Sequence, residues 1–326
     1  IIVAYLADLN STVTDAGRVY IITGTTSITN SNPITIDLST DQADYTLYGI
    51  DAGDQAGFYV SSGDVNGDGY DDVIISAYKA DAYWDNTESG EVYIVYGDNL
   101  TTTMYLSTAA DITIYAASAD ERLGRSVASG RSNNDGYYDL LIGASRASPE
   151  GRTSAGKAYL IYGAASLSAT INLSETSAVD VVIYGANPDP TGAGDIQLGD
   201  ELGRSCAFGD INGNGFDDLI LGALGYDDSP TRDVGAAYVI WGGGPITLSI
   251  APSSTTASEG DAVTYILTAT NAAGSRDISQ KGIFTITPGA GGTWVHNVYT
   301  TEVDGSWTVT ATYQGLYITA TLLSLI

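Results

Sequence analysis

The sequence GDVNGDGYDD (residues 63–72) carries oxygen-bearing side chains at alternate positions, followed by a glycine and a final aspartate. Ca2+ binds about six to eight hard oxygen ligands at roughly 2.3–2.6 Å, and a tight loop can supply them from one short segment. Gly69 allows the sharp turn that such a loop needs. The pattern therefore predicts a calcium cage. Its expected ligands are Asp64, Asn66, Asp68, the backbone carbonyl of Tyr70, and Asp72.

The end of this loop distinguishes it from an EF-hand. An EF-hand needs a bidentate glutamate at loop position 12, and Ile75 occupies that position here. The apolar run that begins at Asp72 is typical of a β-strand instead. We therefore expect the ion to hold a turn between two strands.

A second copy of the pattern, GDINGNGFDD (residues 209–218), keeps every ligand position. For both loops the alternative is a solvated turn without metal, but the repeated spacing favours calcium. The expected ligands of the second copy are Asp210, Asn212, Asn214, the backbone carbonyl of Phe216, and Asp218.

A third copy, GRSNNDGYYD (residues 130–139), is degenerate. It keeps Asn133, Asp135 and Asp139, but Arg131 replaces the first aspartate. A guanidinium beside two carboxylates can take the place of the ion's charge. We expect this loop to bind calcium weakly or not at all.

The chain is strongly acidic, with 39 Asp and Glu against 12 Lys and Arg and a formal net charge of −27. Such a surface lacks the positive charge that displaces phosphate counterions, which argues against nucleic acid and anionic membranes as partners. The simpler explanation is that the charge keeps an exposed protein soluble or suits a salty medium. Nothing in the composition suggests disorder, since 44% of the residues are hydrophobic.

Cys206 is the only cysteine, so no intrachain disulfide can form. Val127 holds the matching position in the preceding repeat, which indicates a small core residue and not a nucleophile. Calcium can stabilise an extracellular protein that lacks disulfides, and calcium outside cells suits loops of this type. No apolar run reaches the roughly 18 residues of a membrane span.

A glycine-ended strand recurs along the chain at intervals of 73, 66 and 79 residues. Each copy alternates apolar with small or polar residues, which predicts a strand. A short strand, a calcium-type loop and an apolar strand precede the later copies, and another strand follows. Four short strands at this period predict β-propeller blades made of four-stranded antiparallel sheets. The copies are AGRVYIITG, SGEVYIVYG, AGKAYLIYG and VGAAYVIWG, ending at Gly24, Gly97, Gly163 and Gly242.

The blocks LGRSVASG, DLLIGA and AGKAYLIYG, with the loops at Asp64 and Asp210, resemble FG-GAP repeats. These repeats are the blades of the N-terminal β-propeller of integrin alpha subunits. The resemblance covers roughly residues 1–243 and implies calcium-binding propeller blades. The Phe-Gly pair of the family is Ala-Gly or Leu-Gly here, and Arg131 departs from the loop pattern.

The first blade is incomplete by this alignment. Residues 1–8 match residues 74–81, so the inner strand and loop that should precede them are missing. We expect two whole and two partial blades, fewer than in an integrin-like propeller, and a chain that is a piece of a longer one. The alternative is a native start whose missing strand comes from elsewhere in the fold or from another subunit.

The composition changes after Trp241, where the sequence GGGP suggests a linker. Residues 244–326 alternate strand-length runs with turn signals, which predicts an immunoglobulin-like β-sandwich. The stretch GGTWVHNVYTTEVDGSWTVTATYQG resembles Ig-like modules of large bacterial and archaeal surface proteins, with Trp307 expected in the core. The expected domains are residues 1–243 and residues 244–326.

His296 is the only histidine, so any Ser-His-Asp or Cys-His arrangement would depend on it. A surface position on a strand is the simpler expectation. Carboxylate pairs of the glycosidase type remain an alternative among so many acids. Three N-glycosylation sequons are candidate modification sites, although chance sequons are common in a threonine-rich chain. They begin at Asn10, Asn99 and Asn172.

These features predict an all-β protein of the cell surface or extracellular space, with Ca2+ as its cofactor and no enzymatic activity. Its expected role is structural or adhesive, as a subunit of a cell-surface layer or an extracellular filament. Its expected partners are further copies of itself, other surface proteins or glycans. The alternatives are a non-polymeric propeller that binds carbohydrate or protein and, more remotely, a polysaccharide-active enzyme.

Overall fold

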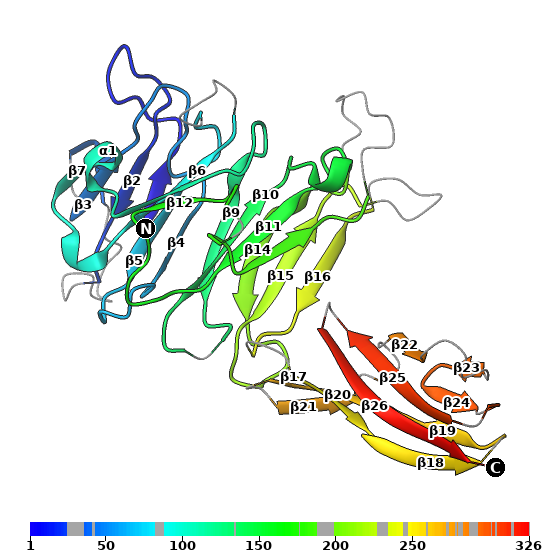
Figure 1. Ribbon diagram of the computed structural model, residues 1–326. Helices are drawn as coiled ribbons and strands as arrows, with labels where there is room; N and C mark the ends of the chain where they lie inside the picture. The colour runs from blue at the N-terminus through cyan, green and yellow to red at the C-terminus, as the bar shows by residue number, and fades with distance from the viewer. Residues whose placement is uncertain are drawn as a thin grey trace. The chain divides into compact units, whose positions relative to one another are not determined.

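The computed structural model divides the chain into two compact units, Ile1–Gly242 and Gly243–Ile326 (Figure 1). Residues 244–246, which include part of the expected linker, lie outside the described residues. The structure describes residues 1–24, 36–40, 43–81, 88–133, 135–175, 177–187, 199–226, 234–243, 247–258, 260–271, 274–277, 279, 283–286, 293–300, 302–303, 305–313 and 316–325.

Both units are built from β-strands, so the all-β prediction is confirmed. The helices of the described residues are one short α-helix and three single 3-10 turns, none long and apolar enough to cross a membrane. They are α1 (Leu106–Ala109), η1 (Leu38–Thr40), η2 (Gly97–Asn99) and η3 (Pro149–Gly151).

The described residues of the first unit form four sheets, which we call blades 1 to 4 in chain order. In each blade, consecutive strands pair antiparallel, as the repeated sequence predicts. Blade 1 contains β1 (Ile2–Ala4), β2 (Arg18–Ile21) and β3 (Tyr45–Tyr48); blade 2 contains β4 (Val60–Gly63), β5 (Asp72–Ala77), β6 (Glu91–Val95) and β8 (Ile112–Tyr115); blade 3 contains β9 (Leu123–Gly130), β10 (Asp139–Ala144), β11 (Lys157–Ile161) and β13 (Val181–Tyr184); blade 4 contains β14 (Leu202–Gly209), β15 (Asp218–Ala223) and β16 (Ala236–Ile240).

Two short strands cross from one blade to the one before it. β7 (Thr103–Tyr105) pairs parallel with β3 of blade 1, and β12 (Thr170–Asn172) pairs parallel with β8 of blade 2. The sequence pattern alone placed these segments inside their own repeats. In the structure they extend the outer edge of the preceding blade, so consecutive blades share backbone hydrogen bonds as well as apolar contacts.

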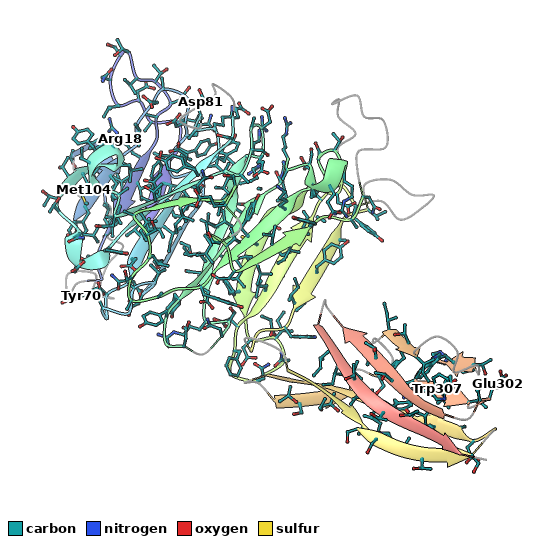
Figure 2. The ribbon with its side chains drawn as sticks, in the orientation of Figure 1. Arg18, Tyr70, Asp81, Met104, Glu302 and Trp307 are labelled. Carbon is teal, nitrogen blue, oxygen red and sulfur yellow. The ribbon has the colours of Figure 1, made fainter. Side chains whose placement is uncertain are left out.

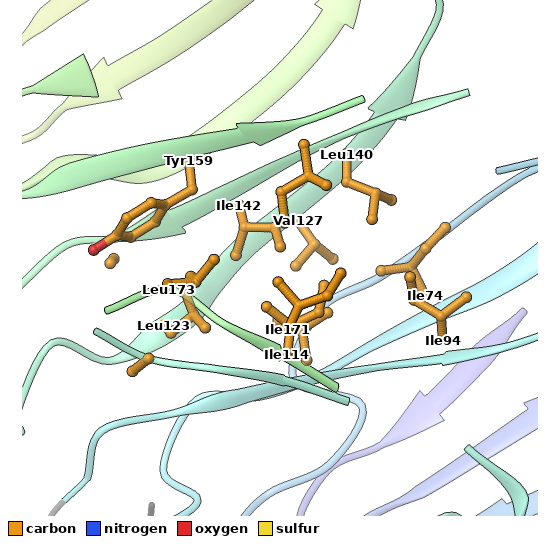
Figure 3. Packing of buried hydrophobic residues seen from close by; sticks show 14 of the residues in the cluster. Ile74, Ile94, Ile114, Leu123, Val127, Leu140, Ile142, Tyr159, Ile171 and Leu173 are labelled. Atoms are coloured by element: carbon orange, nitrogen blue, oxygen red, sulfur yellow. The ribbon is translucent and has the colours of Figure 1, made fainter. Parts of the chain in front are cut away.

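The core of the first unit lies between the blades. Successive side chains of a strand point to opposite faces of its sheet. Val73 and Ile75 of β5 therefore pack toward blade 1, whereas Ile74 packs with Leu140 and Ile142 of blade 3 (Figure 3). All six residues of β5 are buried, which explains its uninterrupted apolar run. Complete burial of one such aliphatic side chain contributes about 1.5–3 kcal/mol.

Blades 3 and 4 approach each other closely at a glycine. A Cβ atom on Gly143 of β10 would lie 1.9 Å from the backbone oxygen of Gly203 on β14. The hydroxyl of Ser126 donates a hydrogen bond to the same oxygen at 2.8 Å. Gly143 is therefore required by the distance between the blades.

The second unit has three small sheets with one shared core, in which Tyr265, Leu267 and Val309 are fully buried. Its assignment as an Ig-like sandwich stays a prediction. The sheets contain β17 (Thr247–Ala251), β20 (Ile266–Asn271) and β21 (Gly274–Asp277); β18 (Ser254–Ser258), β26 (Leu316–Leu325), β25 (Gly305–Tyr313) and β22 (Ile283–Ile286); and β19 (Ala262–Thr264), β24 (Val298–Thr300) and β23 (Thr293–Val295).

The positions of Trp307 and His296 in the second unit differ from those expected. Trp307 is only partly buried at the edge of the core, where its indole donates a hydrogen bond to the backbone oxygen of Val303. Trp294 instead contacts three aromatic rings, those of Tyr265, Phe284 and Tyr299. His296 was expected on a strand, but it lies in the exposed turn between β23 and β24 with a φ of 57°.

Candidate functional site

The three calcium-type loops occupy the same place in three blades, between β4 and β5, β9 and β10, and β14 and β15. Gly69, Gly136 and Gly215 have φ values of 92°, 100° and 86°, a region that favours glycine. Figure 2 shows Tyr70 of the first loop and Asp81, which follows β5, at opposite ends of blade 2. The loops therefore gather at one end of the blade strands.

In the first loop the backbone wraps around the carboxylate of Asp64. This carboxylate accepts hydrogen bonds from the backbone N–H groups of Gly67 at 2.7 Å, Asp68 at 3.0 Å and Gly69 at 3.0 Å. Three backbone donors on one carboxylate fix the shape of the turn. They also direct a negative charge toward the inside of the loop.

The next two positions turn inward in the same way. Asn66 Oδ1 accepts a hydrogen bond from the Asp68 N–H at 2.9 Å, and Asp68 Oδ1 accepts one from the Tyr70 N–H at 2.7 Å. The Asn66 amide donates to Asp68 Oδ2 at 2.9 Å. Rotating the Asn66 amide would place its carbonyl oxygen beside Asp68 Oδ2 instead of the NH2 group, so that both oxygens would face a bound cation.

The closing aspartate of the first loop is a fully buried link between two segments. Asp72 is 0% exposed, and its two oxygens accept hydrogen bonds from the N–H of Val65 at 2.9 Å and of Gly97 at 3.0 Å. Burial raises the pKa of Asp72 to about 6, although both backbone donors lower it. Asp72 thus ties the start of the loop to Gly97, which follows β6.

The other two loops repeat this link. Asp139 and Asp218 are also fully buried, and each accepts a hydrogen bond from the glycine after the third strand of its blade, Gly163 at 3.2 Å and Gly242 at 2.9 Å. Burial raises the pKa of Asp139 as well. Sequence reasoning treated these aspartates only as metal ligands. The constant spacing of 24 or 25 residues between aspartate and glycine was the signal that could have revealed the link.

The loop of residues 209–218, which is the third along the chain, resembles the first. Asp210 accepts hydrogen bonds from the N–H groups of Asn214 at 2.9 Å and Gly215 at 2.8 Å. The Asn212 amide reaches both oxygens of Asp218, at 3.1 and 3.2 Å. Asn214 Oδ1 accepts the N–H of Phe216 at 2.9 Å. Of the predicted ligand side chains in this loop, Asn212 and Asp218 are in direct contact, whereas Asp210 and Asn214 bind backbone N–H groups.

The degenerate loop differs from the prediction in one respect. We expected the Arg131 guanidinium beside the carboxylates of Asp135 and Asp139. It lies instead over the ring of Tyr138, 4.7 Å from its centroid, and no ion pair of Arg131 is present in the described part of the chain. An aromatic face attracts a guanidinium, and Arg131 makes this contact in place of the expected contact with the two carboxylates. Asn133 still reaches Asp135, through its amide at 2.7 Å.

Neighbouring loops are joined through their backbones. The Tyr138 N–H donates to the backbone oxygen of Asp64 at 2.9 Å, and the Asp217 N–H donates to that of Arg131 at 2.9 Å. A fixed conformation in one loop therefore restricts the next. The three loops form one continuous row across blades 2, 3 and 4.

The donor set of the first and third loops fits a hard cation by type, because carboxylate, amide and carbonyl oxygens are the ligands that Ca2+ prefers. Among the described residues, no three His, Cys, Asp or Glu side chains are arranged to hold a metal ion. Asp64 and Asp68 now bind backbone N–H groups, so an ion would have to draw these side chains together. Each of these two loops thus supplies the ligand types that Ca2+ prefers within a single turn. Calcium binding stays a proposal.

Blade 2 also contains a buried pair of carboxyl groups away from the loops. Asp54 and Glu91 are 7% and 8% exposed, and the Tyr93 hydroxyl donates to Glu91 at 2.5 Å. Burial raises the pKa of Asp54 to about 7 and also raises that of Glu91, and the nearby carboxylates of Asp51 and Asp81 act in the same direction. In blade 3 the matching residues are an acid and a base, because Lys157 donates to Glu121 at 2.7 Å.

The remaining candidates from the sequence are Cys206 and the three sequon asparagines. Cys206 is half-buried, its thiol faces the backbone oxygen of Leu141 at 3.3 Å, and burial raises its pKa to about 12, which makes it unreactive. Among the sequon asparagines, Asn10 and Asn99 are exposed and Asn172 is half-buried. The Asn99 amide donates to Asp111 at 2.8 Å. Glycosylation of these residues stays a prediction.

Comparison with known proteins agrees with the repeated architecture. Residues 57–95, 123–161 and 202–240 match the family model described as FG-GAP repeat. These segments correspond to strands and loops of blades 2, 3 and 4. The chain therefore contains three FG-GAP repeats, and the predicted resemblance is confirmed for them.

The chain is similar to integrin alpha-PS5 of Drosophila melanogaster, with 30% identity over 182 residues, which cover 56% of this chain and 16% of that protein. Integrin alpha-5 of Xenopus laevis is 29% identical over 222 residues, or 64% of this chain and 18% of that protein. Phosphatidylinositol-glycan-specific phospholipase D of Bos taurus is 32% identical over 134 residues, which cover 41% of this chain and 15% of that protein. The chain thus spans less than a fifth of the length of these relatives.

The buried link at Asp72 leads to a prediction about chelated protein. Asp72→Ala removes both acceptors of Val65 and Gly97 and should lower the free energy of unfolding by about 2–4 kcal/mol in EDTA. Asp68→Ala makes the same charge change at an exposed position and should cost less than about 1 kcal/mol. Urea denaturation measures both. Equal effects would show that Asp72 acts only through metal.

The carboxyl pair leads to a prediction about pH. The folded protein keeps protons on Asp54 and Glu91 that the unfolded chain releases, so its free energy of unfolding should decrease between about pH 4 and pH 7 and then level off. Glu91→Lys reproduces the acid–base pair of blade 3. At about pH 8 it should stabilise the protein by on the order of 1–3 kcal/mol, and by less at about pH 5.

Urea denaturation in constant calcium at both pH values measures this effect. Glu91→Gln is the control, because it removes one acid without supplying a base and should recover only part of the gain. A gain from Glu91→Lys that is independent of pH would show that the two carboxyls are not protonated in the folded state.

Proposed function

We propose that this chain, which carries three FG-GAP repeats, is part of a calcium-stabilised structural or adhesive protein of the cell surface or extracellular space. It acts by protein–protein assembly, as a subunit of a surface layer or filament, and not by catalysis. The observation that carries the proposal is the row of three joined loops at one end of the blades. The similarity to two integrin alpha subunits supports a role at the cell surface.

Calcium would be held by the residues of the first and third loops. It would neutralise carboxylates that otherwise repel one another, and it would stiffen turns that are already joined by backbone hydrogen bonds. The ion supplies charge and rigidity there, not reactivity. Because the loops are linked, two filled loops would also order the degenerate loop between them.

The outer strand of blade 4 supports assembly. In the described residues β16 pairs only with β15, whereas the corresponding strands of blades 1 to 3 each have an outer neighbour. Val239 of β16 is 41% exposed, whereas the matching Leu160 of blade 3 is 3% exposed. An exposed strand edge with apolar side chains can accept a strand from a neighbouring molecule. The proposed contact is this edge, together with the second unit as a spacer.

A non-polymeric propeller that binds carbohydrate or protein is the second proposal, because β-propellers and integrin-like blades do not imply a polymer. The similarity to a phospholipase D covers 15% of that enzyme. Its activity is not transferred to this chain. The sole histidine of the sequence lies in an exposed turn of the second unit.

Calcium binding is tested by counting ions. Isothermal titration calorimetry should find two Ca2+ per chain, with dissociation constants in the range of about 10⁻⁴–10⁻³ M that is typical of extracellular modules. Arg131→Asp restores the missing ligand and should raise the number from two to three. Arg152→Asp makes the same charge change outside the loops and should leave it at two. An unchanged count for Arg131→Asp would contradict the assignment of the loops.

Assembly is tested by electron microscopy of the native material with and without a calcium chelator. Ordered filaments or layers that fray on chelation support the proposal. Val239→Lys places a charge on the open edge and should block assembly without unfolding the chain, whereas Val234→Lys, at an exposed valine outside the strand, should not. Isolated particles under all conditions would favour the non-polymeric propeller.

A further inference from the structure

The ends of the strands opposite the calcium-type loops carry a group of aromatic and basic side chains. Two repeat positions supply them. The residue after the glycine at the start of the first strand is Phe58, Arg125 or Arg204 in blades 2, 3 and 4. The second position is the residue after β5, β10 or β15, or after β1, which is their counterpart in the incomplete blade 1. These residues are Tyr78, Ser145, Leu224 and Tyr5.

These residues contact one another from blade to blade. The Tyr5 ring meets the Phe58 ring edge-on at 5.2 Å, and the Phe58 and Tyr78 rings lie 4.2 Å apart. The Arg125 guanidinium of blade 3 lies 4.6 Å from the Phe58 centroid and 5.3 Å from the Tyr78 centroid. Stacking on two rings holds the guanidinium in one orientation. We call the group the Arg125 patch; its members are Tyr5, Phe58, Tyr59, Tyr78, Arg125 and Arg204.

The charge of Arg125 is not matched by the surrounding protein. Lys79 and Arg122 both pair with Glu88, and Arg204 pairs with Glu201 at 2.9 Å. Arg125 forms no ion pair with any residue that the structure describes. Its partial burial and the neighbouring Arg204 lower the pKa of Arg125. In a chain with 39 acidic residues, an oriented guanidinium that is not ion-paired to any described residue is unusual.

The surroundings of Arg125 suit a ligand with an anionic group and an apolar face. Tyr5 and Tyr59 are 37% and 39% exposed, and both rings pack against Phe58, on which the guanidinium is stacked. A planar guanidinium binds a carboxylate through two parallel hydrogen bonds. A sugar acid carries hydroxyl groups beside its carboxylate, and the phenol hydroxyls of these exposed tyrosines can hydrogen-bond to them.

We propose that the Arg125 patch is a binding site for a carboxylate-bearing sugar, a uronic-acid unit of a glycan. Arg125 holds the carboxylate, and the exposed tyrosine rings stack on the C–H face of the sugar. The net charge of −27 repels densely charged polyanions, so the site takes an isolated acidic sugar and not nucleic acid. The inference depends on neither calcium binding nor assembly, since the patch lies at the other end of the blades.

The test is calorimetric titration of the full chain, in calcium and at low salt, with oligosaccharides that carry one glucuronic or galacturonic acid unit among neutral sugars. Neutral glucose oligosaccharides of equal length and a short aspartate-containing peptide are the comparison probes. The uronic oligosaccharides should bind, more weakly as salt increases, and the neutral oligosaccharides should bind at least about tenfold more weakly. Absence of uronic-acid binding, or equal binding of the peptide, would overturn the proposal.

Substitutions place the site. Arg125→Ala should reduce the affinity for uronic oligosaccharides about tenfold or more, and Arg125→Lys should reduce it several-fold because the planar fork is lost. Arg152→Ala removes a basic residue that lies over Tyr184 and, among the described residues, hydrogen-bonds to no member of the patch, and it should have no effect. Arg125→Gln keeps a planar group for the stacking and serves if the alanine variant fails to fold. Unchanged affinity in the folded Arg125 variants would place the site elsewhere.

Discussion

The first unit depends on burying both faces of its central strands between neighbouring sheets. Ile74 and Ile75 are adjacent in sequence and both 0% exposed, yet they belong to different interfaces, one with blade 3 and one with blade 1. No single blade can bury both faces by itself, so the blades stabilise one another. The short strands, close glycine contacts and crossing strands all follow from this requirement.

Packing alone leaves the turns between strands undetermined, and the buried aspartates fix them. Asp72, Asp139 and Asp218 are each withdrawn from water, and each binds backbone donors from the start of a loop and from the end of a strand far along the chain. A buried carboxylate is tolerated because these donors replace its water. The same residue therefore joins the core to the loops that present oxygen ligands.

The two ends of the blades differ in chemistry. One end displays carboxylate and amide oxygens in linked loops, which suits a hard cation and a rigid surface. The opposite end displays aromatic rings around a stacked guanidinium. The blades thus keep these two groups of side chains apart, at opposite ends of the strands.

The sequence by itself determined the repeats, the all-β class and the position of the calcium-type loops, because strand alternation and the spacing of oxygen ligands are local properties. It could not determine contacts between repeats. The parallel crossing of β7 and β12, the link from Asp72 to Gly97, and the stacking of Arg131 on Tyr138 all involve partners chosen by packing. Arg125 shows the same limit: its position is local, but its stacked guanidinium follows from side chains of another blade. Only the tertiary structure brings these groups together, since their energies depend on burial and distance.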